Sequence, residues 1–364
     1  MTKVYGFVAE FNPFHNGHKL FIDQIKQKYH PEVLIAVMSG NFVQRGDFSV
    51  LSKWQRAQVA INNGVDLVIE LPFAYAVEPA QYFAQGAIAL LNLLKIDTLV
   101  FGTENQLDFE QLSTDILQAQ NNFQQNYQLN SAQNLTQYYQ SLGIEIDKLP
   151  NQLLGLNYVT QIKQQQLAMD VKTIQRLPSN FSATKIRQNM TQGSEVTDLV
   201  PLEMDAMLQQ TTVDWDDYFP FLKYQILSHS PAELRQVYQM VEGLEFKLKK
   251  EVVSSENFAQ FIERIKSKRY TMARLRRLLM YTLMNVTESE INNVYKNPYL
   301  RVLGFDKIGQ EYLSILKKDI KPITRVGKLE KQTLDLEIRA DQIRQLITHK
   351  EQNFGVIPYM KGVN

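Results

Sequence analysis

Cysteine is absent from this chain of 364 residues. Its absence excludes disulfides, zinc–thiolate sites, iron–sulfur clusters and a cysteine nucleophile, and it favours a reducing, cytoplasmic setting. An excess of charge is also lacking. The formal net charge is +1, so any surface for nucleic acid has to come from a local cluster of basic residues. No stretch approaches the roughly 18 uncharged apolar residues of a membrane span, and we expect neither a membrane span nor a signal peptide.

The residues that are present have the composition of a globular protein, with 44% hydrophobic and 21% charged side chains. The length predicts two or three domains, and we find no internal repeat. The first hundred residues alternate between continuous apolar runs, typical of buried parallel strands, and helical patterns. The predicted strands are residues 4–9, 32–38, 67–71 and 98–101, and the predicted helices are residues 18–29, 52–62 and 82–94.

This alternation predicts an α/β fold, in which a parallel sheet is covered by helices on both faces. Ligands of such sheets bind at the carboxyl ends of the strands. A helix after Pro150, a short strand at 171–176 and a helix that begins at Ser182 continue the pattern. We therefore predict a first domain at residues 1–195.

A Gln- and Asn-rich insertion interrupts this domain at about residues 106–149. A high density of Gln and Asn is compatible with disorder. The apolar residues Phe109, Leu112 and Ile116 keep a helical spacing, which favours exposed helices instead.

Beyond residue 200 the alternation stops, and helical patterns dominate. The predicted helices are residues 218–227, 231–240, 244–253, 258–266 and 271–284, followed by weak strands near 299–303 and 322–324. These patterns predict a mainly helical second domain at residues 196–364, with a small mixed tail.

The stretch Glu10–His18 (EFNPFHNGH) carries the clearest chemical signal, because it joins the first strand to the first helix. His15 and His18 flank Gly17, and a helix N-terminus offers unpaired N–H groups to a phosphate. Both imidazoles can donate hydrogen bonds to an α-phosphate in its transition state. Histidines with ordinary loop contacts, or a metal pair, are the alternatives; the full run favours the phosphate site, and we predict no metal site.

A second candidate element spans residues 182–187. The hydroxyls of Ser182 and Thr184 and the guanidinium of Arg187, at the start of a helix, suit the β- and γ-phosphates of ATP or leaving pyrophosphate. Alone this is a routine capped helix. Its place downstream of the first motif favours the functional interpretation.

Polar residues around the second strand leave alternatives open. A loop with Ser39, Asn41, Gln44 and Arg45 follows that strand, and it either contacts the substrate or forms a turn. Lys53 and Arg56 are predicted on an exposed helix face, where they either meet RNA phosphates or are simply solvated, which is the usual outcome.

Several motifs together resemble a known family. The H-N-G-H run and residues 182–187 resemble the HxGH nucleotidyltransferase superfamily, although many small adenylyltransferases carry Asp where this chain has Asn12. The fuller pattern resembles the bacterial tRNA(Met) cytidine acetate ligase family. That resemblance lies in residues 10–18, 37–42, 44–46, 52–54, 64–72, 101–105, 150–155 and 266–271.

This resemblance implies a Rossmann-like (HUP-type) domain and a cytoplasmic enzyme that activates acetate with ATP and Mg²⁺ as acetyl-adenylate. The acetyl group then passes to N4 of the wobble cytidine (C34) of elongator tRNA(Met), giving N4-acetylcytidine, and no obligate protein partner is implied. His15 and His18 are the implied catalytic residues. The implied ATP-binding residues are Val8, Ala9, Glu10, Phe11, Asn12, Pro13, Phe14, His15, Asn16, Gly17, His18, Lys19, Leu20, Phe21, Gly102, Asn151, Arg176, Ser182, Thr184 and Arg187.

Arg176 is equally compatible with a surface arginine at the end of a strand. The basic stretch 266–277 either binds tRNA phosphates or pairs with acids such as Glu288 and Glu290. Because a tRNA substrate needs such a surface, we favour tRNA binding, with Tyr270 available for stacking. The predicted tRNA-binding residues are Lys268, Arg269, Arg274, Arg276 and Arg277.

Two other functions remain open at this stage. A small-molecule adenylyltransferase would share the phosphate chemistry, but it does not need the long helical region after residue 200. A non-catalytic, nucleotide-sensing RNA-binding protein would keep the basic stretch, but it would tolerate loss of the histidines.

Overall fold

The computed structural model describes residues 3–104, 107–119, 150–176, 181–210, 212–241 and 243–362. The Gln- and Asn-rich insertion lies mostly outside these ranges, so the prediction of helices over residues 120–149 stays a prediction. Its first part forms helix α5 (Phe109–Ala119). Phe109 and Ile116 of this helix are buried, as their helical spacing predicts.

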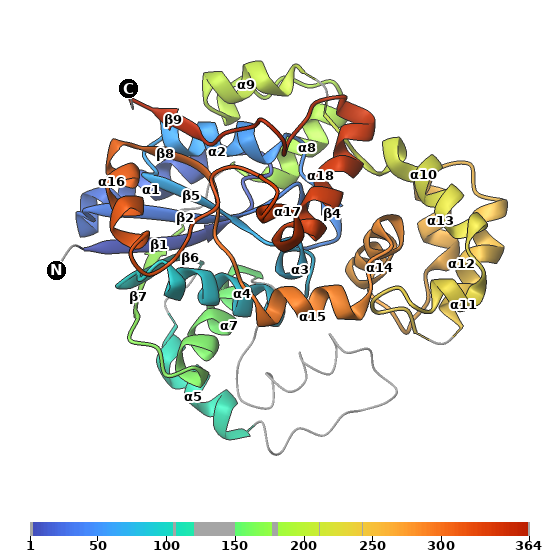
Figure 1. Cartoon of the computed structure of the whole chain (residues 1–364), viewed down its shortest axis with the longest axis horizontal. Coiled ribbons are helices and arrows are strands. Elements are labelled where there is room, and N and C mark those ends of the chain that lie inside the picture. Colours follow the sequence, from blue (N-terminus) through green and yellow to red (C-terminus); the bar gives the residue numbers. More distant parts are fainter. Residues whose placement is uncertain are drawn as a thin grey trace.

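A seven-stranded sheet forms the centre of the molecule (Figure 1), in the order β7-β6-β1-β2-β5-β8-β9. The pairs β7–β6, β6–β1, β1–β2 and β2–β5 are parallel, as predicted, whereas β8 is antiparallel to β5. The strands are β1 (Val4–Ala9), β2 (Val33–Ser39), β5 (Leu67–Leu71), β6 (Thr98–Thr103), β7 (Asp170–Gln175), β8 (Arg301–Asp306) and β9 (Tyr359–Lys361).

Helices cover both faces of this sheet because its central strands are apolar on both sides. Along β2, Leu34 and Ala36 pack with α1 (Asn16–Tyr29) and α2 (Lys53–Asn62) in one core cluster. Ile35 and Val37 face the other way, as the two-residue period of a strand requires. They belong to the cluster formed with α4 (Ala80–Leu93), α7 (Pro150–Gln164) and α16 (Lys307–Leu316).

The second half of the chain is mainly helical, and Figure 1 shows α10 to α13 in yellow to the right of α14, away from the sheet. The predicted helix at 231–240 ends early, as α11. The remaining helices are α3 (Phe73–Ala76), α8 (Ala183–Thr191), α9 (Leu202–Leu208), α10 (Trp215–Ser228), α11 (Pro231–Leu234), α12 (Leu244–Val253), α13 (Phe258–Ile265), α14 (Met272–Met284), α15 (Glu288–Lys296), α17 (Glu330–Thr333) and α18 (Asp335–Thr348), with a 3-10 turn at Thr197–Leu199.

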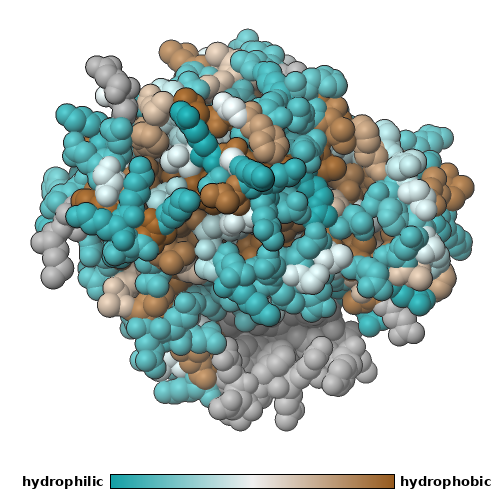
Figure 2. Space-filling view, viewed as in Figure 1, coloured by the Kyte–Doolittle hydropathy of each residue, from teal (hydrophilic) through white to brown (hydrophobic). Residues whose placement is uncertain are grey.

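The end of the chain returns to the sheet, since β8 and β9 are two of its strands. The predicted division at residues 195 and 196 stays a prediction, although the later segment contributes to the first sheet. Hydrophilic side chains cover much of the face seen in Figure 2, with hydrophobic ones between them. No helix in the described ranges combines the length and the apolar composition that crossing a bilayer requires.

A short hairpin connects the sheet to the helical region. It consists of β3 (Phe42–Val43) and β4 (Asp47–Phe48), joined by a turn in which Gly46 has φ +70°. The ring of Phe48 stacks on Tyr218 of α10 at 4.0 Å, and Trp215 donates its indole N–H to the Gly46 carbonyl at 3.1 Å. The hairpin is therefore anchored to α10.

A buried ion cluster joins α2, β5, β8 and α18. The Lys53 ammonium donates to both carboxylate oxygens of Glu70, at 2.8 and 2.9 Å, and to Asp341 at 2.7 Å. Arg301 donates to the same Asp341 oxygen at 3.2 Å, and all four side chains are buried. The expectation that Lys53 is exposed is wrong, because carboxylates from distant segments neutralise its charge inside the core.

Arg56 is also buried, again contrary to the expected exposed face. Its guanidinium donates to the backbone carbonyls of Glu10 at 2.6 Å, Ser39 at 3.0 Å and Leu51 at 3.2 Å, and to Gly40. The five donors of an arginine can satisfy several carbonyls of an irregular loop at once. Arg56 therefore shapes the loops at the carboxyl ends of β1 and β2.

Removing one carboxylate from the ion cluster should destabilise the protein strongly. In Asp341→Ala, the positive charges of Lys53 and Arg301 stay buried but lose one of the carboxylates that neutralise them. We therefore expect the free energy of unfolding to fall by about 3–5 kcal/mol. The matched control is Asp335→Ala on the same helix, where the side chain is 71% exposed and the expected loss is below about 1 kcal/mol. Urea unfolding measures both values. Equal losses in the two variants would contradict a structural role for the cluster.

Candidate active site

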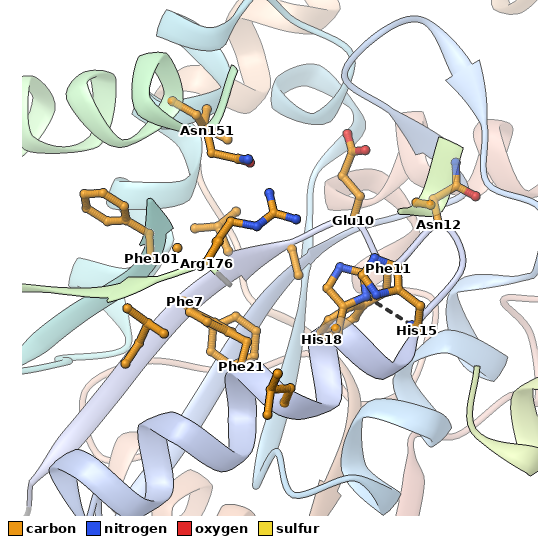
Figure 3. A pocket seen from close by; sticks show the side chains of 18 of the residues that line it. Phe7, Glu10, Phe11, Asn12, His15, His18, Phe21, Phe101, Asn151 and Arg176 are labelled. Carbon is orange, nitrogen blue, oxygen red and sulfur yellow. Dashed lines mark hydrogen bonds between the residues drawn. The ribbon is translucent and has the colours of Figure 1, made fainter. Parts of the chain in front are cut away.

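A cavity of about 340 Å³ opens at the carboxyl ends of β1, β6 and β7, beside the N-terminus of α1. Its size lies in the range of small-molecule sites. Figure 3 shows the two histidines on one side of it, with Glu10 above them, and Phe101, Asn151 and Arg176 on the other side. The predicted residues that line it are Val8, Ala9, Glu10, Phe11, Asn12, His15, Gly17, His18, Leu20, Phe21, Gly102, Asn151, Arg176 and Arg187.

The remaining predicted nucleotide residues do not line this cavity. They are Pro13, Phe14, Asn16, Lys19, Ser182 and Thr184. Phe14 is instead buried beneath the motif, with its ring 4.8 Å from that of Phe11. Ser182 is the N-cap of α8 without a side-chain cap bond, and both hydroxyl residues of this element are exposed.

The two histidines stack at the first turn of α1. Their ring centroids lie 3.6 Å apart, with an interplanar angle of 23°. The backbone N–H of His15 donates to Nδ1 of His18 at 3.1 Å. Because Nδ1 of His18 accepts this bond, the proton of its neutral ring lies on Nε2.

Burial keeps both imidazoles neutral. Desolvation, and then the positive charge of Arg176, lower the pKa of His15 to about 4. Desolvation, and then the charges of His15 and Arg176, lower the pKa of His18 well below its ordinary value. Near pH 7 each ring therefore carries a single N–H donor. Nδ1 of His15 has no hydrogen-bond partner in the described part of the chain.

Gly17 permits the close stacking of the motif. A Cβ at this position would lie 3.0 Å from Nδ1 of His15 and 3.1 Å from Cβ of Phe181. A side chain there would push the His15 ring out of its place, so the glycine of the motif has a packing reason as well as a ligand-approach reason.

Asn12 positions the motif through hydrogen bonds of its side chain and its carbonyl. Its side-chain oxygen accepts from Val50 N at 2.8 Å, and its side-chain nitrogen donates to Phe48 O at 3.3 Å. Arg187 of α8 donates to the Asn12 carbonyl at 2.6 Å. The structure thus connects the first motif to both the hairpin and the second predicted element.

Asn151 and Arg176 meet on the far side of the cavity through Glu104. The Asn151 amide donates to Oε1 of Glu104, and Nη1 of Arg176 lies 3.8 Å from the same oxygen. At Gly102 a Cβ would approach Cγ of Arg176 to 3.1 Å. Gly102, Asn151 and Arg176 are therefore neighbours in space, although they are far apart in the sequence.

The loop after β2 divides into two groups. Asn41 donates to Asp341 and to Gln352, both at 2.8 Å, so it holds the loop to the C-terminal segment. Gln44 and Arg45 instead line the cavity. Asn41 thus shapes the loop, whereas Gln44 and Arg45 can contact a ligand.

The basic stretch around α14 lies against the hairpin turn. A Cβ at Gly46 would clash with the backbone of Arg276 and Arg277. Arg276 pairs with Asp47 at 3.7 Å, and Arg277 has no hydrogen-bond or ion-pair partner among the described residues. This end of α14 is therefore close to the loop that carries Arg45.

The other basic residues of the stretch differ in their surroundings. Arg274 donates to the side chain of Gln239 at 2.6 Å and to its carbonyl at 3.2 Å, so this guanidinium is engaged within the protein. Lys268 and Arg269 are exposed before the helix begins. Of the acids considered as partners, Glu290 pairs with Arg339 instead.

Sequence reasoning missed a set of cavity residues that includes several apolar ones. Apolar side chains at strand ends carry no signal that distinguishes them from core residues, and Tyr158 and Phe83 lie within helical patterns of ordinary spacing. The missed residues are Phe7, Gln24, Phe83, Phe101, Leu154, Tyr158, Ile174, Gln175 and Ala183.

Comparisons with known proteins agree with this geometry. The family model of the HIGH Nucleotidyl Transferase matches residues 2–355. The tRNA(Met) cytidine acetate ligase of Lactobacillus gasseri is 39% identical over 384 residues, covering 98% of each chain. The protein of the same name from Lactobacillus delbrueckii subsp. bulgaricus is 40% identical over 380 residues, again covering 98% of each chain.

Solved structures show the same likeness. The crystal structure of apo Thermotoga maritima TmcAL has a TM-score of 0.88 and 27% identity, and covers 99% of both chains. The same protein bound with alpha-thio ATP has a TM-score of 0.87. The match of nearly the whole chain, together with the histidine motif that lines its cavity, places this protein in the HIGH nucleotidyl transferase family and, within it, in the tRNA(Met) cytidine acetate ligase family.

Proposed function

We propose that this protein is an ATP-dependent ligase that converts acetate to acetyl-adenylate and transfers the acetyl group to N4 of the wobble cytidine of elongator tRNA(Met). The observation that carries the proposal is the pair of neutral, stacked histidines at the N-terminus of α1, facing Asn151 and Arg176 across one cavity. The names of the close relatives support the choice of acetate and tRNA. Such an enzyme works in the cytoplasm, where tRNA is modified.

In the first step an acetate oxygen attacks the α-phosphorus of ATP. A new P–O bond forms, the bond to the β-phosphate breaks, and pyrophosphate leaves with the electron pair. The N–H of His18 at Nε2 donates to an α-phosphate oxygen as its charge grows. The backbone N–H groups at the start of α1 stabilise the same charge. No protein nucleophile is required, because the residues position the reactants and stabilise charge.

Arginines on two sides of the cavity suit the rest of the nucleotide. Arg176 and Arg187 line it from β7 and α8, and either guanidinium can bind phosphate oxygens in a bidentate way. Mg²⁺ would accompany ATP as its counter-ion. Among the described lining residues Glu10 is the one carboxylate, which fits a cation held by the phosphates rather than by a cage of protein ligands.

The tRNA would approach over the hairpin. Arg45 reaches the cavity from the hairpin loop, and Arg276 and Arg277 lie on the helix packed against its turn. We expect these side chains to form a basic path from α14 to the cavity. Phosphates of an RNA strand on this path would place a base near the activated acetyl group.

Isotopic labelling tests the proposed function. The protein is incubated with ATP, labelled acetate and bulk tRNA, and the RNA is then digested to nucleosides. We expect the label in N4-acetylcytidine. Label confined to a small molecule would contradict the proposal and would instead support an adenylyltransferase.

Removing the His18 donor should slow adenylate formation. In His18→Ala the rate of acetate-dependent pyrophosphate release should fall roughly 10²–10³-fold, equivalent to about 3–4 kcal/mol, because one transition-state hydrogen bond is lost. The control is His30→Asn at the other end of α1, where the exposed residue has φ 47° and Asn tolerates that conformation. The control should release pyrophosphate at the normal rate, and a similarly active His18→Ala would refute the assigned role.

Removing the Arg176 charge should raise the pKa of His15. Burial lowers this pKa first and Arg176 second, so in Arg176→Met it should rise above about 4 but stay below 6.5. The imidazole would then gain its proton at a higher pH than in the wild type. Histidine NMR titration measures this change. Lys172→Met, an exposed lysine on the same strand, should leave the titration unchanged, and a fall in the Arg176→Met pKa would contradict the geometry.

Neutralising Arg276 and Arg277 of α14 should weaken tRNA binding. For Arg276→Gln with Arg277→Gln we expect the slope of log affinity against log salt to become shallower by about 1 to 2, because two phosphate contacts are lost. Acetyl-adenylate formation should continue normally. Arg264→Gln, an exposed arginine of α13, is the matched control. Unchanged tRNA affinity at low salt would assign the two arginines a structural role only.

A further inference from the structure

Glu10 is an acidic side chain that lines the cavity, and its surroundings leave one of its oxygens free. Oε1 accepts the backbone N–H of Gln44 at 2.9 Å, which holds the carboxylate toward the hairpin. Oε2 has no hydrogen-bond partner among the residues that the structure describes, and no cation lies within ion-pair distance of either oxygen there. Figure 3 shows the side chain above the histidine pair, with its carboxylate pointing away from the two rings.

Burial raises the pKa of Glu10, and nearby hydrogen bonding and positive charges oppose this rise. Arg187, Arg45 and Arg56 come from α8, the hairpin loop and α2, and their positive charges lower its pKa, as does the Gln44 hydrogen bond. Burial, the largest effect, raises the same pKa above its ordinary value. A carboxylate in this balance is a stronger base than an exposed one, which suits general-base catalysis.

The other polar groups of the cavity are less suited to accept a proton. Nε2 of His18 carries the ring's own proton, because His15 N–H occupies Nδ1. Burial and Arg176 weaken His15 as a base. Tyr158 on α7 stays a neutral phenol, because burial, and then the charge of Glu10, raise its pKa well above the ordinary value.

Glu10 also lies on the side from which RNA would arrive. Its anchor, Gln44, precedes Arg45 in the hairpin, and the turn of that hairpin packs on Arg276 and Arg277. A base delivered along this path would enter the cavity beside Gln44, which holds Glu10. The histidines and the helix N-terminus would then remain with the phosphate of the adenylate.

On the basis of the proposed function, we propose that Glu10 is the catalytic residue that accepts the proton of the attacking cytidine amine. The N4 lone pair attacks the acetyl carbonyl carbon, and the new C–N bond forms as a proton passes from N4 to the free oxygen of Glu10. The bond between the carbonyl carbon and the phosphate oxygen then breaks, and AMP leaves with that electron pair. The carboxylic acid returns its proton to solvent.

Separating the two half-reactions in Glu10→Gln tests this role. The glutamine keeps the shape and an oxygen for the Gln44 N–H, but it cannot take up the proton. We expect acetate-dependent exchange of pyrophosphate into ATP to fall much less than transfer, because Glu10 lines the nucleotide cavity but accepts no proton in the first half-reaction. Single-turnover transfer from enzyme-bound acetyl-adenylate to tRNA should fall 10²–10⁴-fold, the range for loss of a general base. Glu10→Asp should transfer faster than Glu10→Gln, because it keeps the charge.

Three results would overturn the proposal: transfer at the wild-type rate in Glu10→Gln, an equal fall of exchange and transfer, or equal transfer rates in the two variants. An equal fall would assign Glu10 to nucleotide or Mg²⁺ binding. Glu32→Gln, an exposed carboxylate beside the amino end of β2, is the control and should match wild type in both assays. If the proposed function itself is wrong, the wild-type protein will make no acetylated cytidine, which distinguishes that outcome from failure of the Glu10 role alone.

Discussion

The position of the site depends on the buried ammonium of Lys53 between Glu70 and Asp341. A charge without compensation is too costly to bury, so α2, β5 and α18 have to assemble together. Asp341 also accepts from Asn41, and Arg344 on the same helix donates to the carbonyls of Ser49 and Val50. The C-terminal helix thereby fixes the loop from β2 to α2.

That loop in turn holds the histidine motif. Val50 N donates to the Asn12 side chain, Arg187 holds the Asn12 carbonyl, and Arg56 holds the Glu10 carbonyl. The first turn of α1 follows directly. A chain of hydrogen bonds therefore runs from α18 to His15 and His18. It explains why a segment so late in the sequence returns to the sheet beside β5.

The balance of charge in the cavity fits a polyanionic ligand. Arg45, Arg176 and Arg187 line it, whereas the histidines are neutral and Glu10 is the one acid among the described lining residues. The helix N-terminus adds further positive potential. In our account, phosphates entering this space neutralise the arginines, and the imidazoles act as uncharged donors at the reacting phosphorus.

The sequence predicted most of what depends on local pattern. Strands β1 and β5 were predicted with their observed bounds, because short continuous apolar runs are distinctive. The clustering of Glu10, His15, Gly102, Asn151 and Arg176 at one sheet edge also agrees with the strand-end rule, with the family resemblance naming the residues.

What the sequence could not predict depends on distant partners. Lys53 can be buried because it pairs with Asp341, which is 288 residues away. The helical pattern around Lys53 shows only that the position is polar, and it does not show whether the side chain is buried. The weak strand predicted near residue 301 becomes β8. It pairs with β5, which is far away in the sequence, so local pattern could not predict this pairing either. Phe101 and Tyr158 line the cavity because β6 and α7 pack against each other, and no local sequence pattern predicts that packing.

In the proposed reaction an acetate oxygen attacks the α-phosphorus of ATP and stays bound to it when the acetyl group leaves. Acetate labelled with ¹⁸O in both oxygens tests this step directly, in a reaction with ATP and tRNA followed by mass spectrometry of the nucleotides. We expect AMP that carries one ¹⁸O atom in its phosphate and acetylcytidine that carries the other. Unlabelled AMP, or ¹⁸O in pyrophosphate or inorganic phosphate, would contradict it.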